Sequence, residues 1–254
     1  MTIAQTLRDA FETGQQLAPF SDADPGFDLA AGYAAQRALT ALRQQDGARV
    51  IGVKAGFTNT QIWDTFGIRA PIHGPVFDTS LATGPISIAA FMEPLIEPEL
   101  VFRMASTPKP GMDDAALLAC VEAIAPGFEI VHSVFPGWRF TAPDSVAAGA
   151  MHGALVIGAF LPATPAMRAA LADFTVELRC DGTVMDQGHA ANLLGSGPLE
   201  VLRHLIGLDS MEPLNPGDLV STGTVTRALP IKPGQTWQAR FNGLPLAELS
   251  VALT

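Results

Sequence analysis

Two glutamates, Glu97 and Glu99, have the spacing of a metal-binding pair on a strand. The alternation over 95–102 is typical of a β-strand, in which residues two apart project from the same face. The two carboxylates then lie roughly 6–7 Å apart at the backbone, close enough to bind one ion and to repel each other without it. Oxygen ligands without Cys or His favour a hard cation such as Mg²⁺ or Mn²⁺. A solvated strand face is the alternative.

Two further polar residues, Lys54 and Asp78, are candidates for ion-pair or acid–base chemistry. Lys54 lies in a strand predicted over 50–58, and Gly52 and Gly56 share its face, so a ligand could approach the ammonium group closely. An exposed lysine beside packing glycines is the alternative. Asp78 follows a loop that enters a strand and is a candidate catalytic acid, or otherwise a residue that forms the next turn.

A third carboxylate, Glu129, stands in an apolar strand predicted over 128–134. A lone buried carboxylate needs a partner, and a cation held by Glu97 and Glu99 would supply it. His132 projects from the opposite face, so it is not a ligand if Glu129 is one. We expect His132 to be a hydrogen-bonded structural residue.

The elements that must position these residues are mostly strands. Helical spacing indicates helices over 3–17 and 28–45, which form a predicted N-terminal helical cap over 1–48. Further helices are predicted from Asp113 or Asp114 through Ile124, ended by Pro126-Gly127, from Thr141, and after 195–198. Strands are predicted over 154–160, in a hairpin over 174–186 with Asp181-Gly182 as its turn, over 216–224, and in a C-terminal antiparallel meander. Pro98 predicts an edge strand or a bulge at its position.

This order of elements predicts an α+β fold that is mainly β. It lacks the regular strand–helix alternation of a parallel doubly wound sheet. The sequence also lacks a glycine-rich dinucleotide loop, a phosphate loop and a Gly-x-Ser-x-Gly elbow, so nothing in it supports a nucleotide enzyme or a serine hydrolase.

Composition excludes some partners. The net charge of −10 argues against a nucleic acid or an anionic membrane as a partner, because both need a basic surface. The 254 residues are 48% hydrophobic, enough for a sizeable core. Two cysteines without metal-site spacing favour a reducing compartment. With no signal peptide and no uninterrupted apolar span, we expect a cytoplasmic protein.

Several motifs, in order along nearly the whole chain, are similar to one known family. The sequence resembles the 2-keto-4-pentenoate hydratase group of the fumarylacetoacetate hydrolase superfamily, which includes the 4-oxalocrotonate decarboxylases. The motifs are Ile51-Gly52-Val53-Lys54-Ala55-Gly56-Phe57-Thr58, Gly67-Ile68, Asp78, Ile96-Glu97-Pro98-Glu99-Leu100-Val101-Phe102, Glu129-Ile130-Val131-x-Ser133, Leu194-Gly195 with Pro198-Leu199, and Pro216-Gly217-Asp218 through Ser221-Thr222-Gly223-Thr224 to Pro230-Ile231-Lys232-Pro233-Gly234.

The resemblance implies layered, rolled mixed β-sheets in a catalytic domain over 49–254, after the N-terminal helical region. It places Glu97, Glu99 and Glu129 where the family holds a divalent ion, usually Mg²⁺ or Mn²⁺. Lys54 stands at the family's active-site lysine and Asp78 at an acid near the same pocket. Leu100, Ser133 and Thr224 stand at positions expected to contact the substrate. Family members commonly form homo-oligomers, so a homo-oligomer is expected here.

The sequence departs from the family pattern around the metal-ligand positions. His132 replaces an Asp in the expected Glu-Ile-Val-Asp-Ser, and Asp144-Ser145-Val146-Ala147-Ala148-Gly149 lacks an expected Asp-Asn pair. His152 stands where a small residue is expected. The trio of glutamates is intact, so these departures bear on the substrate and the reaction rather than on the ion.

The resemblance and the residues together predict a metal-dependent hydratase that adds water to a 2-hydroxy-2,4-dienoate in the catabolism of aromatic compounds. Decarboxylation of a 4-oxalocrotonate-type diacid is the second expectation, and C–C cleavage of an acylpyruvate, with His132 or His152 activating water, is the third. A non-enzymatic family member that supports a pathway decarboxylase or hydratase as a partner subunit is a further alternative. Such a scaffold would have no need of three converging acids.

Overall fold

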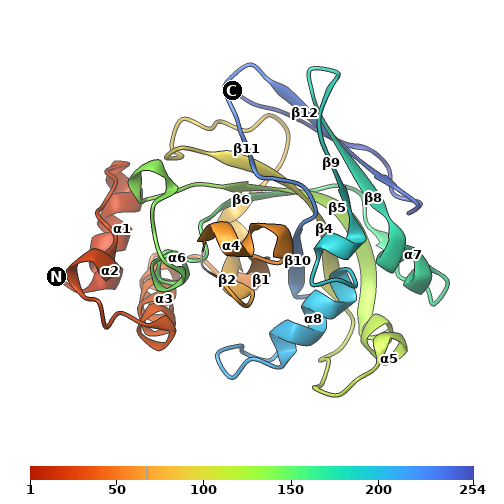
Figure 1. Ribbon diagram of the computed structural model, residues 1–254, viewed down its shortest axis with the longest axis horizontal. Coiled ribbons are helices and arrows are strands. Elements are labelled where there is room, and N and C mark those ends of the chain that lie inside the picture. The colour runs from red at the N-terminus through yellow and green to blue at the C-terminus, as the bar shows by residue number, and fades with distance from the viewer. Residues whose placement is uncertain (67) are drawn as a thin grey trace.

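The computed structural model describes residues 1–66 and 68–254, and these residues form two β-sheets (Figure 1). Gly67 of the family motif lies outside the described residues. The larger sheet has the strand order β2-β1-β10-β4-β5-β6-β3, with β11 beside β4 and β7 beside β5. Its strands are β1 (Val50–Gly56), β2 (Ile72–Phe77), β3 (Leu81–Ala82), β4 (Leu95–Met104), β5 (Val121–Val131), β6 (His152–Ile157), β7 (Leu161–Pro162), β10 (Leu219–Thr224) and β11 (Leu229–Pro230).

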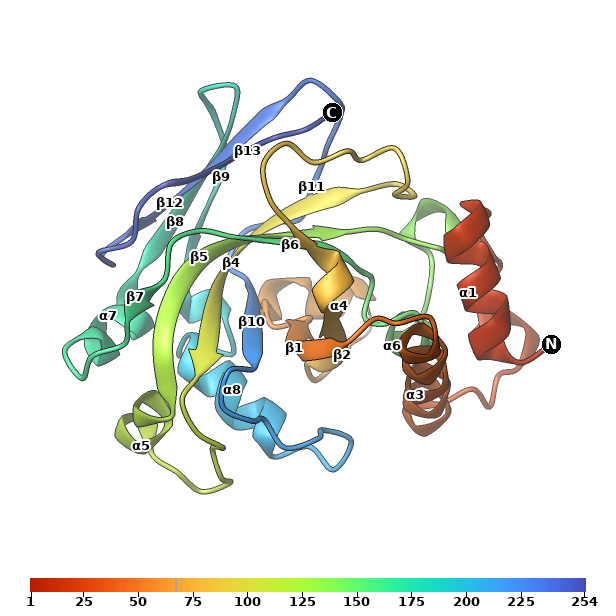
Figure 2. The same cartoon turned by 180° about the vertical axis from the view of Figure 1, so that it is seen from behind.

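The second sheet has the order β13-β12-β8-β9 and lies beside the long, curved strands β4 and β5 (Figures 1 and 2). Its strands are β8 (Thr175–Cys180), β9 (Thr183–His189), β12 (Thr236–Asn242) and β13 (Leu249–Ala252). The predicted hairpin over 174–186 is confirmed as β8–β9, and the predicted C-terminal meander as β12–β13. β1 pairs with β10 in parallel and β4 pairs with β5 antiparallel, so the predicted mixed, mainly β architecture is confirmed.

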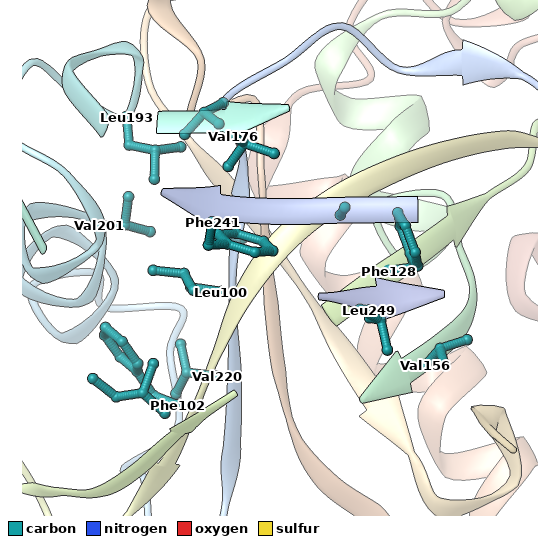
Figure 3. Close-up of a cluster of buried hydrophobic side chains, with 14 of the residues drawn as sticks. Leu100, Phe102, Phe128, Val156, Val176, Leu193, Val201, Val220, Phe241 and Leu249 are labelled. Carbon is teal, nitrogen blue, oxygen red and sulfur yellow. The ribbon is translucent and has the colours of Figure 1, made fainter. Parts of the chain in front are cut away.

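The main hydrophobic core lies between the two sheets (Figure 3). Leu100, Phe102 and Phe128 of the larger sheet pack here with Val176 and Phe241 of the smaller one. Alternation along β4 and β5 sends these side chains to one face and leaves the opposite face for the glutamates. The core therefore fixes the strands that carry the acids.

The two longest helices lie in the N-terminal region, and shorter helices are distributed along the rest of the chain. The described helices are α1 (Ile3–Thr13), α2 (Phe20–Ala23), α3 (Leu29–Gln45), α4 (Trp63–Phe66), α5 (Asp114–Ala119), α6 (Ala142–Ala147), α7 (Met167–Asp173) and α8 (Pro198–Ile206), with short 3₁₀ turns η1 (Thr60–Ile62), η2 (Asp78–Ser80), η3 (Pro136–Trp138) and η4 (Ala190–Asn192). Among the described helices, none is long and apolar enough to cross a membrane. α1 and α3 bury Leu7 and Leu39 in a second core with Val131 and Ala147. The domain boundary at 48/49 stays a prediction.

The helix predicted through Ile124 is wrong beyond Ala119. The Asp113 carboxylate caps α5 as expected, accepting from the Ala116 amide at 2.8 Å. From Val121 onward the chain is instead the strand β5, which pairs with β4 along its whole length. Apolar residues three and four apart fit either a helix or a strand buried on both faces, and the pairing with β4 decides the outcome.

Pro98 was predicted to mark an edge strand or a bulge, and the edge strand is wrong, because β4 lies between β10 and β5. Pairing on one side of β4 passes from β10, which ends opposite Glu99, to β11, which begins opposite Ile96. Pro126 in β5 occupies a similar gap, between β7 and β6. A proline has no N–H for the ladder, and both prolines stand where the neighbouring strand changes. At each proline, the strand therefore lacks a paired neighbour on one side, although it lies in the interior of the sheet.

Two buried histidines make the fold sensitive to acid. Burial lowers the pKa of His73, stacked on Tyr33, and of His132, packed between Phe11 and Phe91, to about 4 in each case. In the unfolded chain both would have their ordinary pKa of 6.5. The stabilisation from their neutral forms is therefore complete above pH 6.5 and is lost as the pH falls towards 4.

We expect the free energy of unfolding to fall by about 3 kcal/mol for each of these histidines over that pH range. Urea unfolding at steps between pH 7 and pH 4.5 measures the loss. His132→Gln should remove roughly one histidine's share of it, because the glutamine does not titrate. A pH dependence of H132Q that runs parallel to that of the parent would contradict the assignment to His132.

Candidate functional site

Three glutamates from two strands meet on the face of the larger sheet opposite the core. In the β4–β5 ladder Glu97 lies directly across from Glu129, and Glu99 follows on the same face of β4. Carboxylate oxygens of Glu97, Glu99 and Glu129 lie within 4.8 Å of one another. The sequence-predicted trio is thus brought together, and it has the size of a site for one ion.

Glu99 is held in place by a bulge in β10. The register of β10 against β4 shifts between Ser221 and Thr224. At this point the Ser221 hydroxyl donates to Glu99 Oε2 at 2.5 Å and the Gly223 amide donates to the same oxygen at 2.9 Å. Gly223 has φ = +86°, and a Cβ there would lie 1.9 Å from the Thr58 hydroxyl oxygen, so only glycine fits. The bulge leaves Glu99 Oε1 for another partner.

Lys54 extends from β1 to the same site. Its ammonium group lies 3.1 Å from Glu129 Oε2 and donates a hydrogen bond to the Ala150 carbonyl at 2.9 Å, and the residue is 3% exposed. Burial lowers the pKa of Lys54, but the three glutamates, Glu129 first, raise it by more, so its pKa lies above the usual value. In the ion-free site Lys54 is therefore an ammonium.

The carboxylates differ in their ionisation. Burial raises the pKa of Glu97 to about 7, with the Lys54 charge opposing and the Glu129 charge adding to the rise. Burial, together with the charges of Glu129 and Glu97, raises the pKa of Glu99 well above its usual value. Burial also acts to raise the pKa of Glu129, but the charge of Lys54 and a hydrogen bond from His152 outweigh it, and the pKa of Glu129 is lowered. Glu129 is the ionised member of the trio.

The donor set fits a divalent cation. Within the described part of the chain, Glu99 Oε1 is buried without a hydrogen-bond donor, and Glu129 Oε2 has only the ammonium of Lys54 as a neighbouring cation. Three carboxylates and one ammonium leave two negative charges when all are ionised. Buried charge of this kind is costly unless it is compensated. One hard divalent ion with oxygen ligands would compensate it.

Two of the trio, Glu97 and Glu99, line the polar end of a cavity of about 110 Å³, whereas Glu129 is buried beside Lys54 and is not among the described lining residues. Lys54, Glu97 and Glu99 line this end, together with Thr58, Asn59, Ser145 and Thr224. The other lining residues are mostly apolar, and two of them, Trp138 and Phe140, are half-buried and come from the loop between β5 and α6. Their ring centroids lie 6.1 Å apart. The cavity therefore has a buried polar floor and an aromatic mouth.

The structure does not bring every predicted site residue to this cavity. Thr224 is among its lining residues, but Asp78, Leu100 and Ser133 are not among the described residues that line it. Leu100 packs in the core beside Phe102, because the alternation that directs the glutamates to one face directs Leu100 to the other (Figure 3). Asp78 accepts from the Arg49 backbone amide and side chain at 2.9 and 2.8 Å. The Ser133 hydroxyl donates to the Phe135 carbonyl at 2.6 Å.

The two histidines that depart from the family pattern have different surroundings. His132 packs among aromatic rings and accepts from the Met92 amide at 3.3 Å, in agreement with the expected structural role. His152 instead lies 2.7 Å from Glu129 through Nδ1. The alternation of side chains along the predicted strands gave no reason to pair His152 with Glu129. Ser221, Trp138 and Phe140 were also missed as site residues, although Ser221 belongs to a motif that carries the family resemblance.

Comparison with known proteins gives the family. A family model described as fumarylacetoacetate (FAA) hydrolase C-terminal matches residues 72–252. The sequence is 30% identical over 237 residues to a 4-oxalocrotonate decarboxylase of Pseudomonas sp, over 91% of this chain and 90% of that protein. It is 31% identical over 255 residues to a 2-keto-4-pentenoate hydratase of Burkholderia vietnamiensis, over 96% of this chain and 94% of that protein.

A solved structure has the same fold. The structure of 4-oxalocrotonate decarboxylase from Pseudomonas putida G7, complexed with magnesium and adipate, matches with a TM-score of 0.91 at 22% identity, over 99% of this chain and 96% of that one. The fold, the extent of the family match and the near-full-length relatives agree with the resemblance in the motifs. The chain belongs to the fumarylacetoacetate hydrolase family of enzymes, in the group that contains the 2-keto-4-pentenoate hydratases and the 4-oxalocrotonate decarboxylases.

Proposed function

We propose that this enzyme is a divalent-metal-dependent hydratase that adds water to a 2-hydroxy-2,4-dienoate in the catabolism of aromatic compounds. The observation that carries the proposal is the convergence of Glu97, Glu99 and Glu129 with Lys54, at a site where Glu97, Glu99 and Lys54 line the floor of one cavity. A 2-hydroxy-dienoate offers one carboxylate and an oxygen on C2 to such a floor. Relatives called 2-keto-4-pentenoate hydratase, aligned over nearly the whole chain, support the choice of reaction.

Glu97, Glu99 and Glu129 would hold the ion, which we expect to be Mg²⁺ or Mn²⁺ because the three side chains offer only oxygen ligands. The magnesium in the related decarboxylase structure supports a divalent ion. When bound, such an ion supplies Lewis-acid stabilisation of negative charge on the oxygen at C2 of the substrate. Ser221 and the Gly223 amide keep Glu99 oriented for this task.

Lys54 is the candidate proton carrier. Hydration of 2-hydroxypenta-2,4-dienoate places a hydroxyl group on C4 and one proton each on C5 and C3, while the C2 hydroxyl loses its proton, so the net addition is one water. The Lys54 ammonium can donate one of these protons or pair with the substrate carboxylate. Its contacts with Glu129 and the Ala150 carbonyl fix it at the floor of the cavity. Thr224 lines the same floor and is a candidate substrate contact.

The mouth of the cavity favours a substrate with an uncharged tail. Among the described lining residues the one cationic side chain is Lys54, at the floor. Trp138 and Phe140 lie at the mouth, and the Arg139 side chain between them in sequence pairs with Asp22 and is not among the described lining residues. Burying an unpaired carboxylate there would be unfavourable. This favours a neutral hydroxydienoate over a 4-oxalocrotonate-type diacid.

A matched pair of unreactive ligands tests the tail preference. 2-Oxoadipate and 6-methyl-2-oxoheptanoate share the 2-oxo acid head and differ in a terminal carboxylate or a similarly shaped isopropyl group. With Mg²⁺ present, we expect calorimetry to show at least tenfold tighter binding of the isopropyl compound, since an unpaired buried charge costs more than 1.4 kcal/mol. Tighter binding of 2-oxoadipate would contradict the neutral-tail assignment, and Trp138→Arg should move the preference towards the diacid.

Decarboxylation of a 4-oxalocrotonate-type substrate is the second candidate, favoured by the 30% identical relative of that name. Incubating the Mg²⁺-loaded protein with 2-hydroxypenta-2,4-dienoate, 4-oxalocrotonate and an acylpyruvate, and identifying the products, separates hydration, decarboxylation and C–C cleavage. His132 and His152, proposed as bases for the cleavage, are not among the described lining residues. Activity that is unaffected by EDTA would contradict all three reactions. Absence of Mg²⁺ binding would point to a scaffold subunit.

The assembly state and the location stay predictions from the sequence. We infer a homo-oligomer that associates with a pathway decarboxylase or hydratase, and a cytoplasmic location. Light scattering of the purified enzyme tests the first of these directly.

A further inference from the structure

His152 reaches the face of Glu129 because of an irregularity in the sheet. The β5–β6 register pairs Ile130 with Ala154 but Val131 with His152, so β6 has one extra residue, Gly153. Regular alternation from Leu155, the partner of Glu129, would direct His152 to the opposite face. Because of the extra residue, His152 instead projects from the same face as Glu129. A Cβ on Gly153 would lie only 2.8 Å from the Ile130 carbonyl oxygen, so a residue with a side chain would be too close to the neighbouring strand at this bulge.

The residues before His152 hold an unusual backbone conformation. Gly149, Ala150 and Met151 have φ values of 72°, 54° and 63°. Such values are costly for residues with a Cβ and persist where the surroundings enforce them. This turn directs the Ala150 carbonyl to Lys54 and is followed at once by His152, which contacts Glu129. One short segment therefore contacts both members of the Lys54–Glu129 ion pair.

His152 is bound at both ring nitrogens and is 5% exposed. Nδ1 lies 2.7 Å from Glu129 Oε1, and Nε2 lies 2.8 Å from the Ser80 hydroxyl oxygen. A carboxylate only accepts hydrogen bonds, so Nδ1 carries a proton and donates it to the hydrogen bond with ionised Glu129. Ser80 is the last residue of the turn η2, and the pairing of Asp78 with Arg49 secures the first. The ring is thus fixed from the side away from the cavity.

We propose that His152 is a positioning residue for Glu129, with Ser80 as its anchor. By holding Oε1, the imidazole leaves Oε2 beside Lys54 and available to an ion. The inference rests on the proposed metal site and gives Asp78 a structural task, in securing the turn that carries Ser80. Partners of this kind, which orient a ligand without touching the ion, typically account for 10–100-fold in metal affinity.

Three substitutions separate positioning from mere packing. The side-chain amide of His152→Asn can place a donor near the position of Nδ1, that of His152→Gln near the position of Nε2, and His152→Leu offers none. We expect Mg²⁺ binding, measured by calorimetry on the ion-free proteins, to weaken about 10–100-fold in H152L and H152Q and to recover most of that loss in H152N. Thermal unfolding of the ion-free proteins is recorded alongside.

The outcomes are distinguishable. Mg²⁺ affinity unchanged in H152L and H152Q, or an affinity that follows thermal stability rather than the donor position, would overturn the proposal. Should H152L fail to fold, Ser80→Ala removes the anchor and keeps the imidazole, and it should weaken Mg²⁺ binding in the same direction by a smaller factor. A parent protein that binds no Mg²⁺ would instead refute the proposed function.

Discussion

Replacing Glu97 by glutamine is expected to abolish tight Mg²⁺ binding and to lower kcat/KM by about 10³-fold or more. Loss of an ion that contributes several kcal/mol to transition-state stabilisation costs tenfold for every 1.4 kcal/mol. The substitution preserves shape and removes one of the three negative ligands. Calorimetry with Mg²⁺ and steady-state kinetics on the hydroxydienoate measure the two effects.

The same substitution should stabilise the ion-free protein at pH 8. The pKa of Glu97 is raised to about 7, above its value in the unfolded chain, so its ionisation destabilises the fold as the pH rises through 7. E97Q lacks this loss. Glu122→Gln is the matched control, because Glu122 lies on β5 but is exposed and pairs with Arg103. An E97Q protein that binds Mg²⁺ as tightly as the parent would remove the basis for the metal site.

Replacing Lys54 by methionine is expected to lower kcat about 10²–10⁴-fold, the usual contribution of one positioned acid–base group. Methionine keeps most of the apolar stem and removes the ammonium that lies 3.1 Å from Glu129 Oε2. The ion-free variant should also lose about 3–5 kcal/mol of stability, since Glu129 is left as a buried charge without its partner. Kinetics and urea unfolding measure the two losses.

Mg²⁺ binding should survive in K54M, because a positive charge beside the ligands is removed. This separates Lys54 from Glu97, whose replacement removes binding and activity together. Lys109→Met, on an exposed loop, is the control for the loss of a lysine. A kcat within about tenfold of the parent would contradict the role given to Lys54.

Strand parity explains why much of the site could be predicted. A two-residue period is enough to place Glu97 and Glu99 on one face, and a lone acid in an apolar strand points to a partner such as an ion. The direct opposition of Glu97 and Glu129 depends on the register of two strands joined by a long connection, which local pattern does not encode. Family motifs supplied that information.

Parity failed where the sheet is irregular. The extra residue at Gly153 directs His152 to the face of Glu129, and the bulge at Gly223 directs Ser221 and a backbone amide to Glu99. In both cases a glycine without room for a Cβ was the available signal, but a glycine in a sequence does not say what it lies against. Leu100 shows the opposite error, since parity alone places it in the core.

The left-handed turn at 149–151 divides the enzyme into a part that must stay constant and a part that can vary. Because the Ala150 carbonyl in this turn accepts from the Lys54 amine and the turn leads directly into the imidazole that contacts Glu129, we expect a shift of the turn to disturb both members of the ion pair together. Trp138 and Phe140 belong to a separate loop, fastened by a hydrogen bond from the Trp138 indole to the Glu93 carbonyl. Relatives with other substrates could thus arise by exchanging that loop while the reacting centre is inherited unaltered.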